Sequence, residues 1–488
     1  MTLVETMPAQ SRRPHPRKDA IIDNSNRVAN ERQRWIAKNR AFYRDDRAYM
    51  KFLIPKGVRV LDLGCGTGDL LAELEPSFGL GIDISPAMID QAERLYPHLT
   101  FAVGDIEDDA VIGRIEGPFD YIVMSDTIGM LDDIETALRR LQPLCGPDTR
   151  LIIAYYSHLW EPLLKVAEWA GQKMPQPPTN YLNSTDFLNI LDLADFEPIK
   201  MEYRQLVPRR LLGLGTLINR FIAPIPGIRR LCLRTYVVAR SLTAVRPDEL
   251  SVSVVIPCRN ERGNIEAAIQ RLPAFGRAQE IIYVEGNSSD NTYEECLRVQ
   301  AAYANTHDIK VLKQDGRGKG DAVRKGFAAA TGDVLMILDA DLTMPPEALP
   351  KFYTAIARGK ADFVNGTRLV YPMEDEAMRP LNFIANRFFA GMFSFLVNQR
   401  FSDTLCGTKV LSRKHYEAIA RDRDYFGDFD PFGDFDLIFG AAKQNLKIVE
   451  VPVHYGARVY GETQISRFRD GWLLLRMVGF AFMKLKAF

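Results

Sequence analysis

Residues 60–68 read Val-Leu-Asp-Leu-Gly-Cys-Gly-Thr-Gly, an apolar run that ends in a glycine-rich loop, and residues 70–74 begin a helical pattern. Glycines let the backbone turn tightly and approach a ligand closely, and the N-terminus of the following helix supplies N–H donors. A strand, a glycine loop and a helix in this order predict the first turn of a doubly wound α/β domain with a nucleotide-type ligand.

Acidic residues follow the next predicted strands. Residues 79–83 form a second apolar run that ends in Asp83, about twenty residues after the loop, which is the spacing expected for a carboxylate that binds a ribose diol. A third run, 101–103, leads to Asp105, and a fourth run covers 119–124. Because these short runs alternate with helical ones, we expect a mainly parallel sheet.

A second α/β pattern starts with the apolar run 252–257, after a short, polar, proline-containing stretch at 244–250 that we interpret as a linker. Residues 334–338 form a later strand that delivers Asp339 and Asp341. Two carboxylates two residues apart at a strand end can bind one divalent cation, which bridges them to a diphosphate.

The composition fits a multidomain globular protein. The chain has 488 residues, 47% of them hydrophobic, with 62 basic and 62 acidic side chains. This is too long for one core, so two or three domains are expected. A net charge of zero gives no overall attraction to nucleic acid, and no such partner is expected. The six cysteines contain no Cys-x-x-Cys pair and favour a reducing compartment.

No segment has the features of a signal peptide or of a membrane span. Residues 1–30 are polar, without an apolar core, and are predicted to form a disordered or loosely ordered tail. Three apolar segments, 211–228, 383–397 and 472–488, contain charged residues and are predicted to be amphipathic. For the last two, packing in the core and docking on a membrane surface are both open. We expect a cytoplasmic protein, either free or peripheral on the cytoplasmic face of the membrane.

Residues 31–243 resemble the class I S-adenosylmethionine-dependent methyltransferases, on the strength of the glycine loop and the acids that follow the later strands. The resemblance implies a Rossmann-like domain that binds S-adenosyl-L-methionine. Its implied cofactor-binding residues are Asp62, Gly64, Gly66, Gly68, Asp83, Asp105 and Ile106. Among these, Asp83 would bind the ribose hydroxyls and Asp105 the adenine amino group.

The methyl acceptor is not predicted. Many relatives have a histidine after the fourth strand, where this chain has Gly129 and Met130, so the sequence offers no evident general base. Tyr155, Tyr156, His158 and Trp160 follow the fifth strand and are candidates to face the pocket. The run 35–49 either caps the site or packs on the sheet as an amphipathic helix.

Residues 251–470 resemble family 2 glycosyltransferases of the GT-A fold, especially dolichol-phosphate mannosyltransferase-like members. The matching segments are 255–261, 319–326, 339–341, 403–409, 435–436, 449–453 and 458–463. The resemblance implies an inverting transfer of a sugar from a nucleotide-sugar, with Mg²⁺ or Mn²⁺ bound by Asp339 and Asp341. The implied substrate-binding residues are Pro257, Glu261, Glu285, Lys319, Asp339 and Arg467. The implied catalytic residues are Asp341, Asp403, Asp436 and Arg458.

The acceptor of the sugar leaves two possibilities. A polyprenyl phosphate is largely dianionic near neutral pH and could attack without a strong protein base. A hydroxyl acceptor would need Asp403 or Asp436 as a base.

The sequence therefore predicts a fusion of two transferases in two doubly wound α/β domains, with amphipathic helices and no membrane span. An amphipathic helix at 471–488 would end the chain. The alternative is a glycosyltransferase for a hydroxyl acceptor, with a non-catalytic scaffold or binding module as its N-terminal half. The oligomeric state is not predicted.

Overall fold

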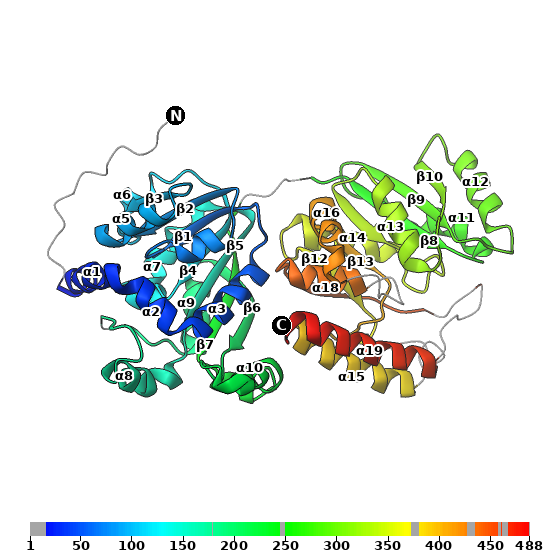
Figure 1. Ribbon diagram of the computed structural model, residues 1–488. Coiled ribbons are helices and arrows are strands. Elements are labelled where there is room, and N and C mark those ends of the chain that lie inside the picture. Colours follow the sequence, from blue (N-terminus) through cyan, green and yellow to red (C-terminus); the bar gives the residue numbers. More distant parts are fainter. Residues whose placement is uncertain are drawn as a thin grey trace. The chain divides into compact units, whose positions relative to one another are not determined.

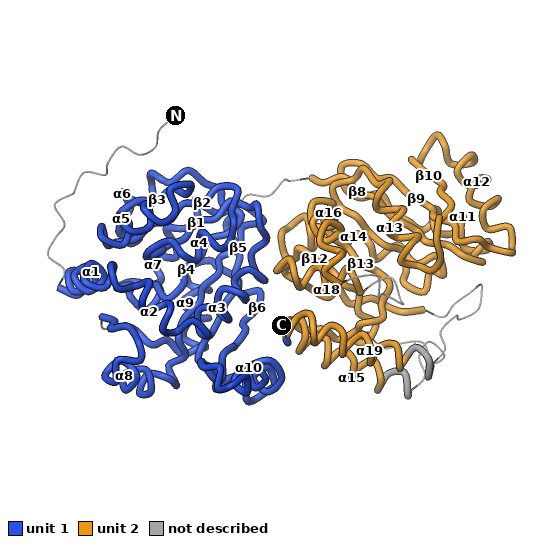
Figure 2. The backbone as a smooth tube through the Cα atoms, viewed as in Figure 1, with its two compact units in different colours: residues 1–245, 487 blue, residues 246–486, 488 orange. Residues whose placement is uncertain are grey.

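The computed structural model describes residues 16–177, 179–244, 249–371, 380–426, 435–456, 460 and 467–487, and describes 380–384 and 467–470 by their backbone alone. The chain divides into two units between residues 245 and 246 (Figures 1 and 2). This division falls inside the stretch that the sequence marks as a linker.

Unit 1 is built on a seven-stranded mixed sheet with the order β3-β2-β1-β4-β5-β7-β6. The strands are β1 (Arg59–Leu63), β2 (Phe78–Asp83), β3 (Thr100–Val103), β4 (Phe119–Ser125), β5 (Cys145–Tyr156), β6 (Phe196–Arg204) and β7 (Arg234–Ser241). Strands β1 to β5 run parallel, whereas β7 lies antiparallel between β5 and β6. The predicted doubly wound α/β fold is confirmed, with an antiparallel edge that the sequence did not predict.

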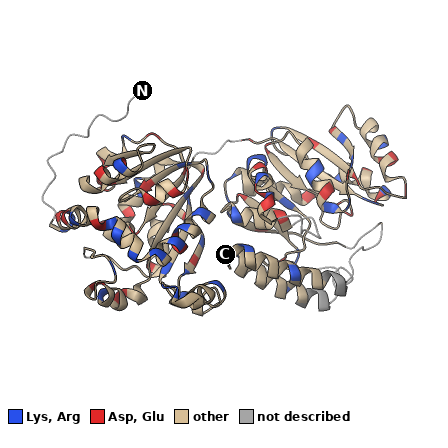
Figure 3. Cartoon of the chain, in the orientation of Figure 1, with Lys and Arg blue, Asp and Glu red and all other residues tan. Residues whose placement is uncertain are grey.

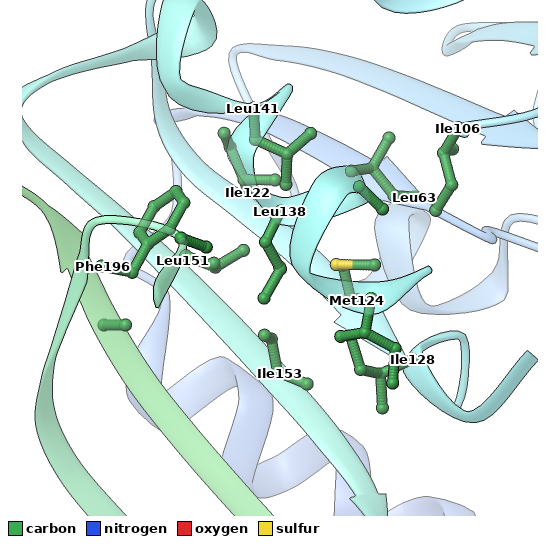
Figure 4. Close-up of a cluster of buried hydrophobic side chains, with 14 of the residues drawn as sticks. Leu63, Ile106, Ile122, Met124, Ile128, Leu138, Leu141, Leu151, Ile153 and Phe196 are labelled. Carbon is green, nitrogen blue, oxygen red and sulfur yellow. The ribbon is translucent and has the colours of Figure 1, made fainter. Parts of the chain in front are cut away.

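Helices surround this sheet. They are α1 (Pro16–Val28), α2 (Arg32–Lys38), α3 (Arg40–Leu53), α4 (Asp69–Glu73), α5 (Pro86–Leu95), α6 (Asp109–Ile112), α7 (Ile134–Arg139), α8 (Glu161–Trp169), α9 (Ser184–Leu193) and α10 (Leu214–Leu217). On one face of the sheet, Leu138 and Leu141 pack against strand residues such as Ile122 and Ile153 (Figure 4). This apolar core fixes the strand ends from which the glycine-rich loop and the acidic residues follow.

The prediction of a loosely ordered tail over residues 1–30 is wrong for its second half. Residues 16–28 form α1, and a further turn covers 29–31. Ile21 and Val28 are buried against the rest of unit 1, and Lys18 is also buried. These contacts are made to residues far along the chain, so the local polar composition did not indicate them.

Unit 2 has a second seven-stranded mixed sheet, with the order β10-β9-β8-β11-β13-β12-β14. The strands are β8 (Val252–Cys258), β9 (Gln279–Glu285), β10 (Asp308–Lys313), β11 (Val334–Ile337), β12 (Phe363–Thr367), β13 (Lys409–Ser412) and β14 (Ile448–Pro452). Only β13 runs antiparallel to its neighbours, β11 and β12, in this part of the structure.

The helices of unit 2 cover the sheet and add a helical pair. They are α11 (Ile265–Arg271), α12 (Thr292–Ala302), α13 (Lys319–Ala329), α14 (Leu349–Ala357), α15 (Pro380–Val397), α16 (Arg413–Arg421), α17 (Arg423–Phe426), α18 (Phe435–Lys443) and α19 (Arg467–Leu485). Helices α15 and α19 lie side by side (Figure 1), with the rings of Phe395 and Phe482 stacked 6.4 Å apart. Among the described helices, none is both long enough and apolar enough to cross a membrane.

Candidate active sites

A cavity of about 1030 Å³ opens in unit 1 where β1, β2 and β4 end. Five of the predicted cofactor-binding residues line it: Gly64, Gly66, Asp83, Asp105 and Ile106. Asp62 is buried in β1, and Gly68 precedes α4 with a φ of +75°. Helices α1 and α2 contribute the other wall through residues that include Lys18, Ser25 and Arg32.

The glycine loop is shaped for close approach. Gly64 has a φ of +81°, and a Cβ atom there would overlap the side chain of Thr127. Gly66 has a φ of +55°, and its Cβ would lie 3.0 Å from the guanidinium of Arg32. Since other residues rarely adopt this backbone conformation, only glycine fits both positions without strain.

Two carboxylates, the half-buried Asp83 and the buried Asp62, lie beneath the loop. Asp83 accepts hydrogen bonds from the backbone N–H groups of Gly66 and Ser85, each 2.9 Å long. Burial raises the pKa of Asp83 despite these bonds. Burial, followed by repulsion from Asp83, raises the pKa of Asp62 to about 7, and Arg32 opposes both shifts. Arg32 is therefore the cation that balances this acidic pair.

Arg32 is a site residue that the sequence interpretation missed. Its Nε is buried and has no hydrogen-bond partner among the described residues. A buried N–H group without a partner costs free energy, which an anionic ligand group at the loop would recover. Nothing in the local sequence singled out Arg32, because it is one of several arginines between residues 30 and 50.

Asp105 already has a partner inside the protein. The Nζ of Lys18 lies 2.7 and 2.6 Å from its two carboxylate oxygens, and the same ammonium pairs with Glu107. Lys18 belongs to α1, which thereby closes over this end of the cavity. A ligand amino group at Asp105 would share the carboxylate with Lys18, a contact that the sequence did not predict.

The opposite end of the cavity carries a charged and aromatic cluster. Asp126 follows β4 with a φ of +63° and pairs with Arg234, which is wholly buried. The Nε of Arg234 also donates to Asp46, over 3.0 Å, and its guanidinium lies 4.9 Å from the ring centroid of Tyr156. Tyr43, from the predicted capping run, also lines the cavity.

Asp126 is a second residue that the interpretation missed, because the expected histidine position, at Gly129 and Met130, lies three to four residues further along. Burial raises the pKa of Asp126, and Arg234 opposes this shift. A carboxylate in this place can orient an acceptor or take its proton. Tyr156 lines the cavity as predicted, whereas His158 is exposed and is not among the lining residues.

In unit 2, the metal motif and the acceptor segment meet. The Nζ of Lys319, at the start of α13, lies 2.6 Å from Asp339 Oδ1. A Cβ atom at Gly407 would overlap both the Asp339 carboxylate and the Lys319 ammonium. Asp341 Oδ1 accepts hydrogen bonds from Thr343, 3.1 Å from its N–H and 2.8 Å from its hydroxyl. Three segments that are far apart in sequence therefore converge at the end of β11.

Nearby cations keep Asp339 ionised. Burial alone would raise its pKa, but Lys319, Lys409 and Arg368 outweigh burial and hold the pKa below its ordinary value. No group of three His, Cys, Asp or Glu side chains suited to a metal occurs among the residues with described positions. A cation at Asp339 and Asp341 would therefore take further oxygen ligands from a diphosphate and water, which suits Mg²⁺ or Mn²⁺.

The residues predicted to border the nucleotide lie at the ends of β8 and β9. Pro257 is within β8, and the buried carboxylate of Glu261 accepts a 2.7 Å hydrogen bond from Asn264. Glu285 ends β9 and accepts a bond from the N–H of Ser288. Both carboxylates thus shape the loops that follow these strands.

Asp403, which is predicted to be catalytic, is held by partners inside the protein. Its side chain is fully buried and is paired with Arg368, whose Nε lies 2.6 Å from Oδ2. Asn386 and the N–H of Leu405 donate to its other oxygen, over 2.9 and 3.0 Å. Burial would raise its pKa, but Arg368 outweighs this and keeps it low. A carboxylate held in this way positions the acceptor segment and is a poor proton acceptor.

Asp436, on α18, is also paired with arginines. Its carboxylate lies 3.4 Å from Arg324 and 3.5 Å from Arg423. It lines a separate cavity of about 270 Å³, whose described lining residues do not include those of the metal motif. Arg458 lies outside the described residues, and for Arg467, at the start of α19, only the backbone is described.

Comparison with known families agrees with this division. Residues 33–201 match the family described as "Methyltransferase domain", and residues 253–420 match "Glycosyl transferase family 2". The chain joins a methyltransferase domain to a family 2 glycosyltransferase domain. Both resemblances that the sequence indicated are confirmed.

Two curated relatives match the glycosyltransferase half. The dolichol-phosphate mannosyltransferase of Pyrococcus furiosus is 30% identical over 223 residues, which are 44% of this chain and 60% of that protein. Glycosyltransferase AglD of Haloferax volcanii is 28% identical over 228 residues, 45% of this chain and 35% of that protein. The chain thus covers less than two thirds of either relative.

Solved structures align with each half. A Thermotoga maritima protein described as a SAM-dependent methyltransferase, possible histamine N-methyltransferase, is 20% identical, with a TM-score of 0.35, covering 45% of this chain and 99% of that one. Glucosyl-3-phosphoglycerate synthase of Mycobacterium tuberculosis, solved with Mn²⁺ and uridine-diphosphate, is 19% identical, with a TM-score of 0.34, covering 48% of this chain and 80% of that one.

Proposed function

We propose that the protein is a bifunctional transferase. Its methyltransferase domain would transfer a methyl group from S-adenosyl-L-methionine, and its glycosyltransferase domain would transfer a sugar from a nucleotide-sugar to a polyprenyl phosphate. The observation that carries the proposal is that each domain gathers, at the ends of its parallel strands, the residue types that its own ligand requires.

The cavity of the methyltransferase domain fits S-adenosyl-L-methionine in its charge pattern. Arg32 would bind the carboxylate of the methionine portion, Asp83 the ribose hydroxyls, and Asp105 together with Ile106 the adenine. When bound, the cofactor supplies an electrophilic methyl group. Asp126, whose pKa burial raises in spite of its pairing with Arg234, would orient the acceptor and receive its proton at a carboxylate oxygen, and Tyr43 would help to exclude water.

In the glycosyltransferase domain, Asp339 and Asp341 would hold Mg²⁺ or Mn²⁺, which supplies charge stabilisation for the leaving diphosphate. Lys319 would move from Asp339 to the phosphate oxygens once a cation takes its place, because both cations compete for one carboxylate. Gly407 would let the acceptor segment approach the leaving group closely.

Both candidate bases are ion-paired with arginines, which supports a phosphate acceptor. A hydroxyl acceptor needs a group that takes its proton. Asp403 and Asp436 are both ion-paired with arginines, and Asp403 has a lowered pKa. A phosphate needs no such group, since it is already anionic near neutral pH. The alternative of a hydroxyl acceptor requires a base outside this pair.

The sugar-transfer half is tested with labelled nucleotide-sugars and polyprenyl phosphate, with and without Mn²⁺. We expect the wild type to form a metal-dependent product and Asp341→Ala to lose it by about 100-fold or more. Asp315→Ala is the matched control, because Asp315 is exposed and pairs only at the surface with Lys325. Equal product from Asp341→Ala would show that the metal assignment is wrong.

The methyl-transfer half is tested by isothermal titration of the full chain with S-adenosyl-L-methionine. We expect one binding site per chain. Absence of binding would favour the alternative in which this half is a scaffold or a binding module.

A further inference from the structure

The exposed apolar side chains of unit 1 are concentrated in one region. Helix α8 and the segment 211–231, which contains α10, carry most of the large apolar side chains that this unit exposes. They are Leu159, Leu163, Val166, Trp169, Leu211, Leu212, Leu214, Leu217, Phe221, Ile222, Ile225 and Leu231. Trp169 is 88% exposed, and Leu163 and Leu214 are each 58% exposed. Soluble surfaces rarely gather apolar side chains in this way unless they bind something.

These side chains form one surface, which we call the α8–α10 face. The indole N–H of Trp160, next to α8, donates to the carbonyl of Leu231 over 2.8 Å. Arg209 donates to Gln172, just after α8, over 2.9 Å. The two segments are thus joined at two places, and α8 and α10 lie at the same end of unit 1 (Figure 1).

The charge on the 203–231 part of this face is of one sign, whereas α8 carries Glu161 and Glu168 beside Lys165. No acidic residue occurs between Glu202 and Asp248. Arg209, Arg210, Arg220 and Arg230 are all exposed in this interval. Figure 3 shows how Lys, Arg, Asp and Glu are distributed along the ribbon of unit 1. Apolar side chains interspersed with arginines, with a tryptophan at the edge, are the pattern of a segment that lies in the interface of an anionic membrane. Charge complementarity therefore selects an anionic lipid surface as the occupant.

The backbone also favours exposure of these side chains. Leu211 and Leu212 have φ values of 44° and 57°. Bulky residues rarely adopt this left-handed region, which is normally compensated by packing. Both leucines are exposed, so packing within unit 1 does not compensate this backbone strain.

The face lies next to the acceptor end of the cavity. Leu164, on the inner side of α8, packs in one cluster with Tyr43 and Tyr156, which both line the cavity. Met174 and Gln176, shortly after α8, also line it. A bilayer that contacts the outer side of α8 would therefore lie close to where an acceptor enters.

We propose that the methyltransferase domain docks on an anionic lipid surface through the α8–α10 face and takes its methyl acceptor, a lipid or a lipid-linked molecule, from that surface. The second part rests on the proposed methyl transfer. This face is distinct from the helices α15 and α19, to which the sequence interpretation assigned any membrane contact.

The test is co-sedimentation of the full chain with vesicles of phosphatidylcholine alone, or with about a third of phosphatidylglycerol added. We expect binding to the anionic vesicles only, weakened by salt. Leu212→Asp should reduce the binding constant at least about tenfold, and Arg210→Gln about fivefold. Both positions are exposed, so neither variant should unfold the domain.

Two controls give the result its meaning. Leu95→Asp changes an exposed leucine on α5, away from this face, and should bind vesicles like the wild type. Trp472→Asp, on α19, reports the rival surface and should also bind normally. The proposal would be overturned if Leu212→Asp bound vesicles normally, or if Trp472→Asp were the only variant to lose vesicle binding. So would a wild-type dimer that Leu212→Asp converts to a monomer without any vesicle binding, since a second copy would then cover the face.

Titration with S-adenosyl-L-methionine separates this inference from the proposed function. Leu212→Asp should keep the affinity of the wild type for the cofactor while losing vesicle binding. Vesicle binding by a wild type that fails to bind the cofactor would remove methyl transfer and leave the docking surface standing.

Discussion

Replacing Arg32 with glutamine tests the geometry of the methyltransferase site most directly. The substitution removes a cation whose buried Nε has no partner and which lies beside Gly66. A hydrogen bond between charged groups contributes about 1.5–3 kcal/mol. The dissociation constant for S-adenosyl-L-methionine should therefore rise about 10- to 100-fold.

The substitution also changes the acidic pair beneath the loop. Arg32 lowers the pKa of both Asp62 and Asp83, so its loss should raise both values. Protonation then limits the cost to folding, and we expect the variant to remain folded near pH 6, which is below the pKa of about 7 of Asp62. Binding is best compared under that condition.

Isothermal titration with two ligands makes the test specific. 5′-Methylthioadenosine lacks the amino-acid portion, so Arg32→Gln should bind it as the wild type does. Arg34→Gln is the matched control, because Arg34 is exposed on the same helix, α2. Equal weakening of both ligands, or unchanged affinity for S-adenosyl-L-methionine, would refute the assignment of Arg32 to the carboxylate.

Two further predictions concern stability. Asp403→Asn leaves Arg368 buried without its counter-ion and should lower the unfolding free energy by about 3 kcal/mol. Because the pKa of Asp403 is lowered, the wild type loses this stabilisation in acid, so the difference in unfolding free energy between wild type and variant, measured by urea denaturation, should shrink as the pH falls. A difference that stays constant with pH would contradict the pairing. The pKa of Asp62 is raised from its ordinary value of 3.8 to about 7, so the protonated carboxyl makes its full contribution to the free energy of unfolding below pH 3.8. That free energy should fall by about 4 kcal/mol as the pH rises to 7. Asp62→Asn should abolish that part of the pH slope, and an unchanged slope would show that Asp62 ionises normally.

Local patterns were enough to predict the two folds and the loops that bind ligands. The glycine loop follows the apolar run of β1, and Asp83, Asp105 and Asp339 lie at or just after the ends of β2, β3 and β11, so the pattern of apolar runs was enough to find these positions. The antiparallel strands β7 and β13 were not predicted, because an apolar run does not specify its direction.

The remaining site residues could not be predicted, since their roles come from contacts between distant segments. Lys18 reaches Asp105 across 87 positions, and Arg234 reaches Asp126 across 108. The same effect applies to Asp403, which matched a motif but is paired with Arg368, 35 positions away. A motif identifies a carboxylate, but its partner decides whether it can act as a base.

The two proposals about acceptors support one another through a physical argument. A polyprenyl phosphate stays in a bilayer, and the α8–α10 face is suited to a bilayer with anionic headgroups. If both acceptors are lipids, confinement to one surface raises the effective concentration of each for a protein already docked there. Fusion of the two domains then needs no passage of an intermediate from one cavity to the other. Leu212→Asp should accordingly slow sugar transfer to polyprenyl phosphate in vesicles but not to the same acceptor in detergent. Equal slowing in both would show that the face acts on catalysis and not on docking.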